Sequence, residues 1–274
     1  MTIFTGLKTA LAVLTVTASS WAAAEDKKLQ DVISADHRAE SSSRDEFRNP
    51  AETLAFFGIK PDMTVVEIAP GGGWYTEILA PYLRDSGTFY AAHFDANSSV
   101  GYYKNSRAGF DKKVAASPEL YDQVKISLFE MPSKLDIAPE GSADMVLTFR
   151  NVHNWYMRGG GEENLALAFD AFYTALKPGG VLGVVDHQLP ESYADEAQDL
   201  SGYIKKSTVV KAAQAAGFEL EAESDINANP KDTADYEKGV WTLPPSYRMG
   251  DTDREKYEAI GESDRMTLRF VKPE

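Results

Sequence analysis

The chain has 274 residues, of which 43% are hydrophobic and 26% charged, and these values are typical of a folded globular protein. Its 42 acidic residues outnumber 28 lysines and arginines, and the net charge of −14 disfavours nucleic acid and anionic membrane surfaces as partners. The sequence contains no cysteine, which excludes disulfides and thiolate metal sites.

The first 24 residues have the three-part layout of a cleavable signal peptide. Lys8 precedes the apolar run 9–17, and the alanines 22–24 supply the small residues that a signal peptidase requires. The apolar run is too short to be a permanent membrane anchor. We therefore expect an exported chain, periplasmic or secreted, that begins near Glu25 and has no stable membrane anchor. The alternative is an N-terminal core helix.

The polar residues 25–49 predict an N-terminal helical arm, and the domain proper is expected over 50–274. A helix is expected to begin at Asn49-Pro50, because Asn caps helices and Pro suits the first turn, and to end at Gly58. The arm also carries a charged group that either closes over a ligand site or forms a solvated helix face: Arg44, Asp45 and Arg48.

Beyond the arm, short apolar strands alternate with helices, a pattern that favours parallel βαβ units. We therefore expect an α/β, Rossmann-like fold with a mostly parallel seven-stranded sheet and helices on both faces. The long segment 225–262 predicts a lid or a small packed insertion before the last strand. Strands are predicted at 64–69, 88–94, 124–129, 143–149, 181–185, 218–224 and 266–272, helices at 74–83, 162–176 and 205–216, a helical or irregular stretch at 98–123, and a tight turn at 177–180.

The first strand ends in Gly71-Gly72-Gly73 and leads directly into a helix. Such a turn exposes backbone amides and leaves room for a ligand. Position 76 is Thr, so the dinucleotide fingerprint is incomplete, and no Gly-Lys-Ser/Thr follows, so a phosphate-binding P-loop is excluded. The pattern indicates either a nucleotide-type site of another class or a plain strand-to-helix turn.

Four segments together resemble the class I S-adenosylmethionine-dependent methyltransferases, and in particular a group of exported predicted methyltransferases: 65–73, 89–95, 142–148 and 175–181. The resemblance spans roughly residues 50–225. It implies the Rossmann-like class I methyltransferase fold, S-adenosylmethionine as cofactor, and methyl transfer to an unidentified small-molecule substrate. The alternative is an exported, non-catalytic ligand-binding protein on the same fold, since the cofactor is made in the cytoplasm and is charged.

The resemblance also implies which residues bind the cofactor. By this resemblance Glu67 lies near the amino group of the cofactor's methionine. At the position of the family's ribose-binding acid this chain has His93, and a carboxylate follows two residues later at Asp95. A neutral imidazole cannot hold two hydroxyls as a carboxylate does, so either Asp95 binds the ribose or ribose binding is altered. The remaining cofactor-binding candidates are Ala69, Gly71, Gly73, Glu130, Met131, Arg150 and Asn151.

Three of the four histidines, His93, His153 and His187, fall at the carboxyl ends of predicted strands two, four and five, which converge in this topology. We expect His153 and His187 to serve as general bases, with Asp186 as the third catalytic residue. The alternatives are structural histidines and a metal site formed by the same three side chains, but no metal-binding spacing supports the latter and no metal is predicted. Five aromatic residues either wall a substrate pocket or pack in the core: Trp74, Tyr75, Trp155, Tyr156 and Trp241.

Overall fold

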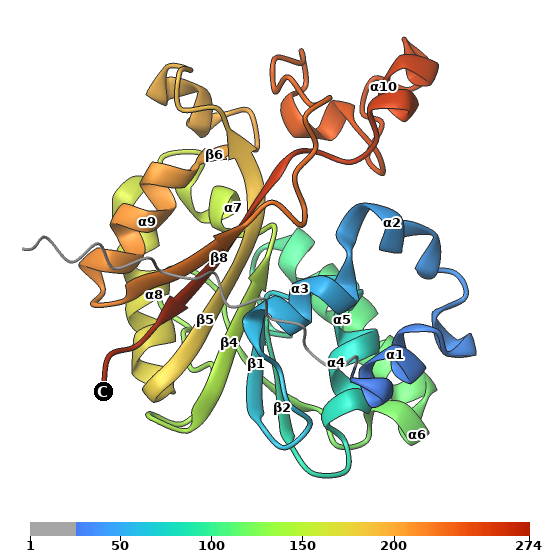
Figure 1. Ribbon diagram of the computed structural model, residues 1–274, viewed down its shortest axis with the longest axis vertical. Helices are drawn as coiled ribbons and strands as arrows, with labels where there is room; N and C mark the ends of the chain where they lie inside the picture. Colours follow the sequence, from blue (N-terminus) through green and yellow to red (C-terminus); the bar gives the residue numbers. More distant parts are fainter. Residues whose placement is uncertain (1–25) are drawn as a thin grey trace, which may run out of the picture.

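The computed structural model describes residues 26–274, so the predicted signal peptide 1–24 lies outside the described residues (Figure 1). An eight-stranded sheet forms its centre, with the order β3-β2-β1-β4-β5-β8-β7 and with β6 paired to β5. The prediction of seven strands missed β6, which is only two residues long. The strands are β1 Thr64–Ile68, β2 Thr88–His93, β3 Lys125–Leu128, β4 Ala143–Phe149, β5 Leu176–Leu189, β6 Ile204–Lys205, β7 Glu219–Ser224 and β8 Arg265–Val271.

The predicted α/β, mostly parallel architecture is confirmed. β1 pairs in parallel with both β2 and β4, and β8 alone runs antiparallel, between β5 and β7. The strand order reverses between β1 and β4. In open parallel sheets ligands bind at the carboxyl ends of the strands beside such a reversal, so the topology itself marks the edge that carries a candidate site.

Helices cover both faces of the sheet. One hydrophobic cluster packs α7, α8 and α9 against one face, and a second packs α1, α3, α4, α5 and α6 against the other. The predicted helix after Asn49 is confirmed as α3, which ends at Gly58 with φ +79°. The helices are α1 Lys27–Ile33, α2 Asp45–Arg48, α3 Pro50–Phe57, α4 Thr76–Leu83, α5 Gly101–Ala116, α6 Pro118–Tyr121, α7 Val152–Tyr156, α8 Gly161–Ala175, α9 Lys206–Ala215 and α10 Arg254–Ile260.

β5 differs from its prediction at both ends. Its pairing with β4 passes from Leu176 directly to Val181, so the residues expected as a tight turn form an irregularity inside a longer strand. At the other end, β5 continues to Leu189 because it also pairs with β6 and with β8. The observed strand therefore includes Asp186 and His187, which lie just after the end of the predicted strand.

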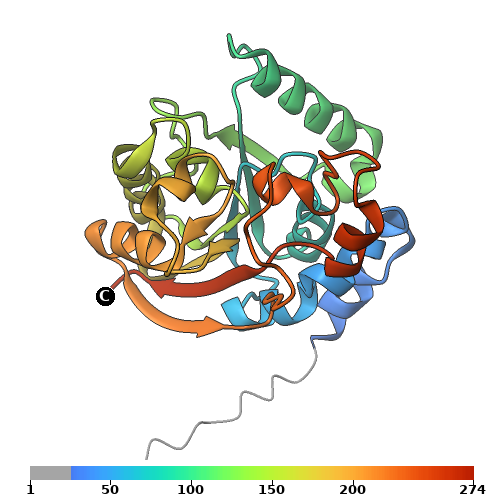
Figure 2. The same cartoon turned by 90° about the horizontal axis from the view of Figure 1, so that it is seen from above.

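The segment 225–262 connects β7 to β8 and contains the 3-10 helix η4, Gly239–Thr242, and α10. Asp232 anchors it, because its carboxylate accepts hydrogen bonds from the Tyr203 hydroxyl and from the Asp264 amide. Seen from above, the segment lies between the N-terminal arm and α5, over the carboxyl ends of the strands (Figure 2). It therefore covers the edge that the topology marks as the candidate site.

Of the helices in the described range 26–274, none is both long enough and apolar enough to cross a membrane.

Candidate functional site

The glycine turn links β1 to α4 and leaves open space beside its backbone. Gly71 and Gly73 have φ of +59° and +78°, values that favour glycine. A Cβ on Gly71 or Gly72 would meet no atom of the described residues within 4 Å, whereas one on Gly73 would press on Phe110 of α5. Ala69 also has a positive φ, of +47°. The turn is therefore shaped so that a ligand can approach Gly71 and Gly72.

Glu67, at the end of β1, lies directly beneath this turn. Its side chain is 3% exposed and accepts a hydrogen bond of 2.6 Å from the Thr76 hydroxyl. Burial raises the pKa of Glu67 to about 7, although the bond from Thr76 and the charge of Arg150 act in the opposite direction. A cationic group placed here would stabilise the ionised carboxylate.

His93 is buried, and both of its ring nitrogens are engaged. Nδ1 accepts a hydrogen bond from the Phe94 amide at 2.7 Å, so Nε2 carries the proton and donates to the Gly71 carbonyl at 3.1 Å. The ring packs on Phe110, and burial lowers the pKa of His93. His93 thus holds the glycine turn against β2, and a ribose hydroxyl would have to displace one of these bonds.

Asp95 and Glu130 form a polar group at the carboxyl ends of β2 and β3. The Glu130 carboxylate accepts hydrogen bonds from the Asp95 amide at 3.1 Å and from the Ser98 hydroxyl at 3.0 Å. Lys134 pairs with Asp95 at 2.7 Å and lowers the pKa of that carboxyl group. The Asp95 side chain is 23% exposed, so it is accessible in a way that His93 is not. Met131, beside Glu130, packs against the hydrophobic core.

The residues after β4 lie against β1. Asn151 donates a hydrogen bond of 2.9 Å to the Ile68 carbonyl, so its amide braces the two strands on either side of the reversal. Arg150 has a φ of +60°, and it is close enough to lower the pKa of Glu67. The turn after β4 and the glycine turn after β1 are therefore parts of one site.

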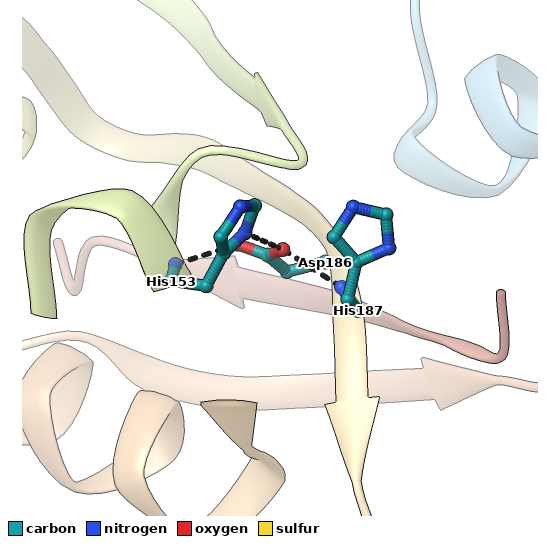
Figure 3. A group of neighbouring side chains, drawn as sticks. All are labelled: His153, Asp186 and His187. Atoms are coloured by element: carbon teal, nitrogen blue, oxygen red, sulfur yellow. Dashed lines mark hydrogen bonds and ion pairs between the residues drawn. The ribbon is translucent and has the colours of Figure 1, made fainter. Parts of the chain in front are cut away.

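A histidine–aspartate pair joins α7 to β5. The Asp186 carboxylate is fully buried and accepts three hydrogen bonds, from His153 Nδ1 at 2.7 Å, the His153 amide at 3.1 Å and the His187 amide at 2.7 Å (Figure 3). The carboxylate thereby keeps the proton of the neutral ring on Nδ1 and leaves Nε2 as a free acceptor. This is the arrangement that a general base requires.

His187 stands beside this pair, with its ring centroid 4.9 Å from that of His153. Burial above all, with the charge of Arg265 acting in the same direction, holds the pKa of His187 well below its ordinary value. Its Nδ1 is hydrogen-bonded to the Ser263 hydroxyl. The lowered pKa favours the neutral form of His187, and the hydrogen bond to Ser263 fixes its ring.

The ligand atoms of His153, Asp186 and His187 lie within 4.8 Å of one another, close enough to share a metal ion. Metal binding would have to compete with the three protein hydrogen bonds that Asp186 accepts. The arginines around the same cavity would also repel a cation. The charge distribution therefore favours the histidine–aspartate pair over a metal centre.

Both histidines face a cavity of about 270 Å³ between the sheet edge, the arm and the segment 225–262. At its wall Glu262 accepts hydrogen bonds from Arg44 at 2.7 Å, from Arg48 at 3.2 Å and from Arg265. The cavity is lined by Arg44, Arg48, Tyr102, Arg150, His153, Asn154, His187, Val240, Trp241, Pro244, Pro245, Ser246, Glu262 and Arg265.

The structure places some of the predicted site residues at this cavity and others away from it. Of the charged group in the arm, Arg44 and Arg48 reach the cavity, while Asp45 pairs with Arg38 instead. Among the five aromatic candidates Trp241 lines the cavity. Trp155 packs against Phe129 and Phe172 in the core. The Tyr75 ring stacks on the Phe149 ring, with 3.5 Å between the ring centroids. Trp74 lies against the guanidinium groups of Arg38 and Arg48. Tyr156 packs against the core.

Sequence reasoning missed Glu262, Arg265 and Tyr102. Glu262 and Arg265 contact residues more than 210 positions earlier in the chain, and neither belongs to a recognisable motif. Tyr102, in the first turn of α5, lines the cavity with 73% of its surface exposed, and no motif in the sequence marks it.

No protein-family model and no curated protein sequence matches the chain. Several solved structures do. An S-adenosylmethionine-dependent methyltransferase from Aquifex aeolicus aligns with 89% of this chain and 98% of its own, at a TM-score of 0.53 and 15% identity. Geranyl diphosphate methyltransferase in complex with S-adenosylmethionine aligns with 89% of this chain and 94% of its own, at a TM-score of 0.55 and 12% identity. The [4+2]-cyclase SpnF aligns with 88% of this chain and 85% of its own, at a TM-score of 0.55 and 18% identity.

The cyclase among these structures illustrates that the fold hosts more than one kind of chemistry. At identities of 12–18% the likeness concerns the architecture. The chain therefore has the fold of the class I S-adenosylmethionine-dependent methyltransferases.

Proposed function

We propose that the protein transfers a methyl group from S-adenosylmethionine to a nucleophile of a small acceptor, and that His153 removes the proton of that nucleophile. One observation carries the proposal. The buried Asp186 carboxylate holds Nδ1 of His153 and leaves Nε2 available in a cavity of about 270 Å³ (Figure 3). The open glycine turn lies at the same edge of the sheet. This arrangement supports a cofactor site and a base at one edge of the sheet.

The residues at the glycine turn fit the cofactor. Gly71 and Gly72 border open space, and Glu67 supplies a carboxylate for the methionine amino group. For the ribose we favour Asp95, because His93 has no free ring nitrogen. Glu130, Met131 and Asn151 would line the site around it. When bound, the cofactor supplies an electrophilic methyl group on a sulfonium, which needs no acid to leave.

His153 would act on the acceptor. A hydroxyl that attacks the methyl group must lose its proton, and the free Nε2 can take it. The imidazolium that forms is stabilised by Asp186, which already accepts the Nδ1 hydrogen bond at 2.7 Å. His187, neutral and held by Ser263, would position the acceptor by a hydrogen bond.

The glycine turn provides the sharpest test of the cofactor. Gly72 lacks a positive φ, and a Cβ on it would meet no described atom within 4 Å, so Gly72→Val should leave the fold intact and fill only the ligand space. By calorimetry we expect micromolar binding of S-adenosylmethionine and S-adenosylhomocysteine that Gly72→Val abolishes. Gly109→Val, on α5 and also in open space, is the matched control and should bind normally.

The outcomes separate the two candidate functions. Absence of binding by either compound would refute the cofactor assignment. Binding without methyl transfer to any acceptor would favour the alternative of an exported ligand-binding protein. That alternative derives its support from the predicted signal peptide, since the cofactor is made in the cytoplasm.

A further inference from the structure

We propose that the acceptor carries a doubly charged oxyanion group, of the phosphate monoester type, which the arginines of the cavity bind. The identity of the bound molecule as the methyl acceptor rests on the proposed methyl transfer. The anion site itself is inferred from the residues that line the cavity. The observations are the excess of positive charge, the unused hydrogen-bond donors and the position of His153 in the same wall.

The cavity concentrates positive charge in an otherwise acidic chain. Four guanidinium groups line it, from Arg44, Arg48, Arg150 and Arg265, and the single carboxylate among the lining residues is that of Glu262. The chain as a whole has a net charge of −14. The four arginines come from the arm, the end of β4 and the start of β8, so their convergence is a product of the fold.

Several donors in this cluster have no partner among residues 26–274. Arg48 is 3% exposed, and its Nη1 has no hydrogen bond. The same holds for the buried Nε of Arg265, and the partly exposed Arg150 lines the cavity beside these two residues. Buried donors are almost always paired in folded proteins, so these unpaired groups indicate a ligand that accepts hydrogen bonds.

The electrostatic environment agrees with this. Burial, followed by the charge of Arg150, lowers the pKa of Arg48 to about 8, and burial with Arg265 lowers that of Arg150 to about 10. Because a guanidinium keeps its proton in proteins, such low pKa values express first the cost of burying these charges and then the repulsion between neighbouring guanidinium groups. An oxyanion would compensate it, and the fork of a guanidinium matches two oxygens of one phosphate or carboxylate group.

The position of the histidines connects the anion site to the reaction. His153 and His187 line the same cavity as the arginines, so an acceptor anchored by its anionic end would extend toward Nε2 of His153. Tyr102 and Trp241 form the less polar part of the wall. The volume of about 270 Å³ suits a small metabolite and excludes a folded macromolecule from the cavity itself.

The test is titration of the full chain with inorganic phosphate in calorimetry at constant ionic strength, with malonate as a dicarboxylate and chloride as the monovalent reference. We expect one saturable site for phosphate and no saturable site for chloride. Malonate binding more tightly than phosphate would assign the site to dicarboxylates and overturn the phosphate assignment. Phosphate binding no tighter than chloride would overturn the anion site altogether.

Variants locate the site. Arg150→Gln removes a guanidinium that lines the cavity and should weaken phosphate binding at least tenfold, while Arg150→Lys should recover only part of that affinity, because an ammonium keeps the charge and lacks the two-donor fork. Arg84→Gln removes the same charge at the opposite sheet edge, where Arg84 pairs with Asp122, and should change binding less than twofold. Circular dichroism checks that each variant is folded. Equal affinities in Arg150→Gln and Arg84→Gln would contradict the proposal.

A second titration separates this inference from the proposed function. Phosphate should bind the protein saturated with S-adenosylhomocysteine as well as it binds the free protein, because acceptor and cofactor occupy different places. Competition between the two would show that the arginines bind the cofactor's own carboxylate and would overturn the inference. Phosphate binding in a protein that binds no cofactor would refute the methyl transfer and leave the anion site supported.

Discussion

At the glycine turn, the proposed role of Glu67 in cofactor binding predicts that this binding depends on pH. Its pKa of about 7 means that it is ionised above neutral pH and protonated below it. Only the ionised form attracts the amino group of the cofactor, so affinity should fall as pH decreases. We expect S-adenosylhomocysteine to bind about tenfold more weakly at pH 6 than at pH 8, measured by calorimetry.

Glu67→Gln is the matched variant for this pH dependence. It keeps the oxygen that accepts the hydrogen bond from Thr76, so the turn retains its local structure. The variant should bind weakly at pH 8 and show little change down to pH 6. A wild-type affinity that is constant over this range would contradict the assignment of Glu67 to the amino group.

Substitutions of His153 and Asp186 should slow the methyl-transfer step and leave cofactor binding largely unchanged. His153→Gln removes the base, and we expect kcat for methyl transfer to fall by about 100-fold or more while cofactor affinity stays within threefold. Asp186→Asn should also lower kcat, because its amide no longer fixes the proton on Nδ1. The measurement is transfer of a labelled methyl group at saturating cofactor. Unchanged kcat in His153→Gln would exclude this residue as the base.

At the scale of elements, Glu262 connects the N-terminal arm to the last strand. Burial alone would raise its pKa, but Arg265, Arg48 and Arg44 outweigh burial and lower it to about 2. Because this value lies below the ordinary 4.5, the carboxylate stabilises the fold above about pH 4.5 and loses this contribution as pH falls toward 2. Ion pairs across more than 200 residues thus hold α2 at the cavity.

We expect Glu262→Gln to lower the free energy of unfolding by about 3–5 kcal/mol at pH 7, because three guanidinium groups would lose their shared anion. Urea unfolding measures this, and Glu258→Gln on the exposed side of α10 is the control, with an expected change below about 0.5 kcal/mol. The difference between wild type and Glu262→Gln should shrink toward pH 2. A loss below about 1 kcal/mol at pH 7 would show that the arm is held by other contacts.

At the scale of the whole molecule, the first described residue already takes part in the fold. Asp26 caps α1 by accepting a hydrogen bond from the Leu29 amide at 3.2 Å, and it also accepts one from the Tyr82 hydroxyl of α4. Cleavage of the predicted signal peptide before Glu25 would therefore leave these contacts intact. Asp26 therefore has a structural role at the start of the described residues.

We accordingly expect the exported protein to begin near Glu25, as determined by N-terminal sequencing, and the chain 25–274 to unfold at the same temperature as the full chain. A chain that starts at Leu29 should be less stable by about 1 kcal/mol, because it lacks the Asp26 cap. Recovery of an exported protein that retains Met1 would contradict the signal peptide.

The sequence alone determined the fold class and the edge that carries the candidate site. Alternation of apolar strands with helices predicts a parallel sheet, because periodicity and helix caps are local in the chain. This is why α3 was predicted from Asn49 to Gly58 and why three histidines were expected at one edge. The same local signals missed the two-residue β6 and the extension of β5, which depend on pairing with distant strands.

Only the tertiary structure decided what surrounds that edge. Glu262 meets Arg44 and Arg48 across more than 210 residues, and His93 uses its nitrogens on Gly71 and Phe94. Neither arrangement has a periodic or spacing signal, because electrostatic pairing acts through space and is independent of separation along the chain. The sequence therefore predicts where a ligand binds, and the folded structure determines the charge that the ligand meets there.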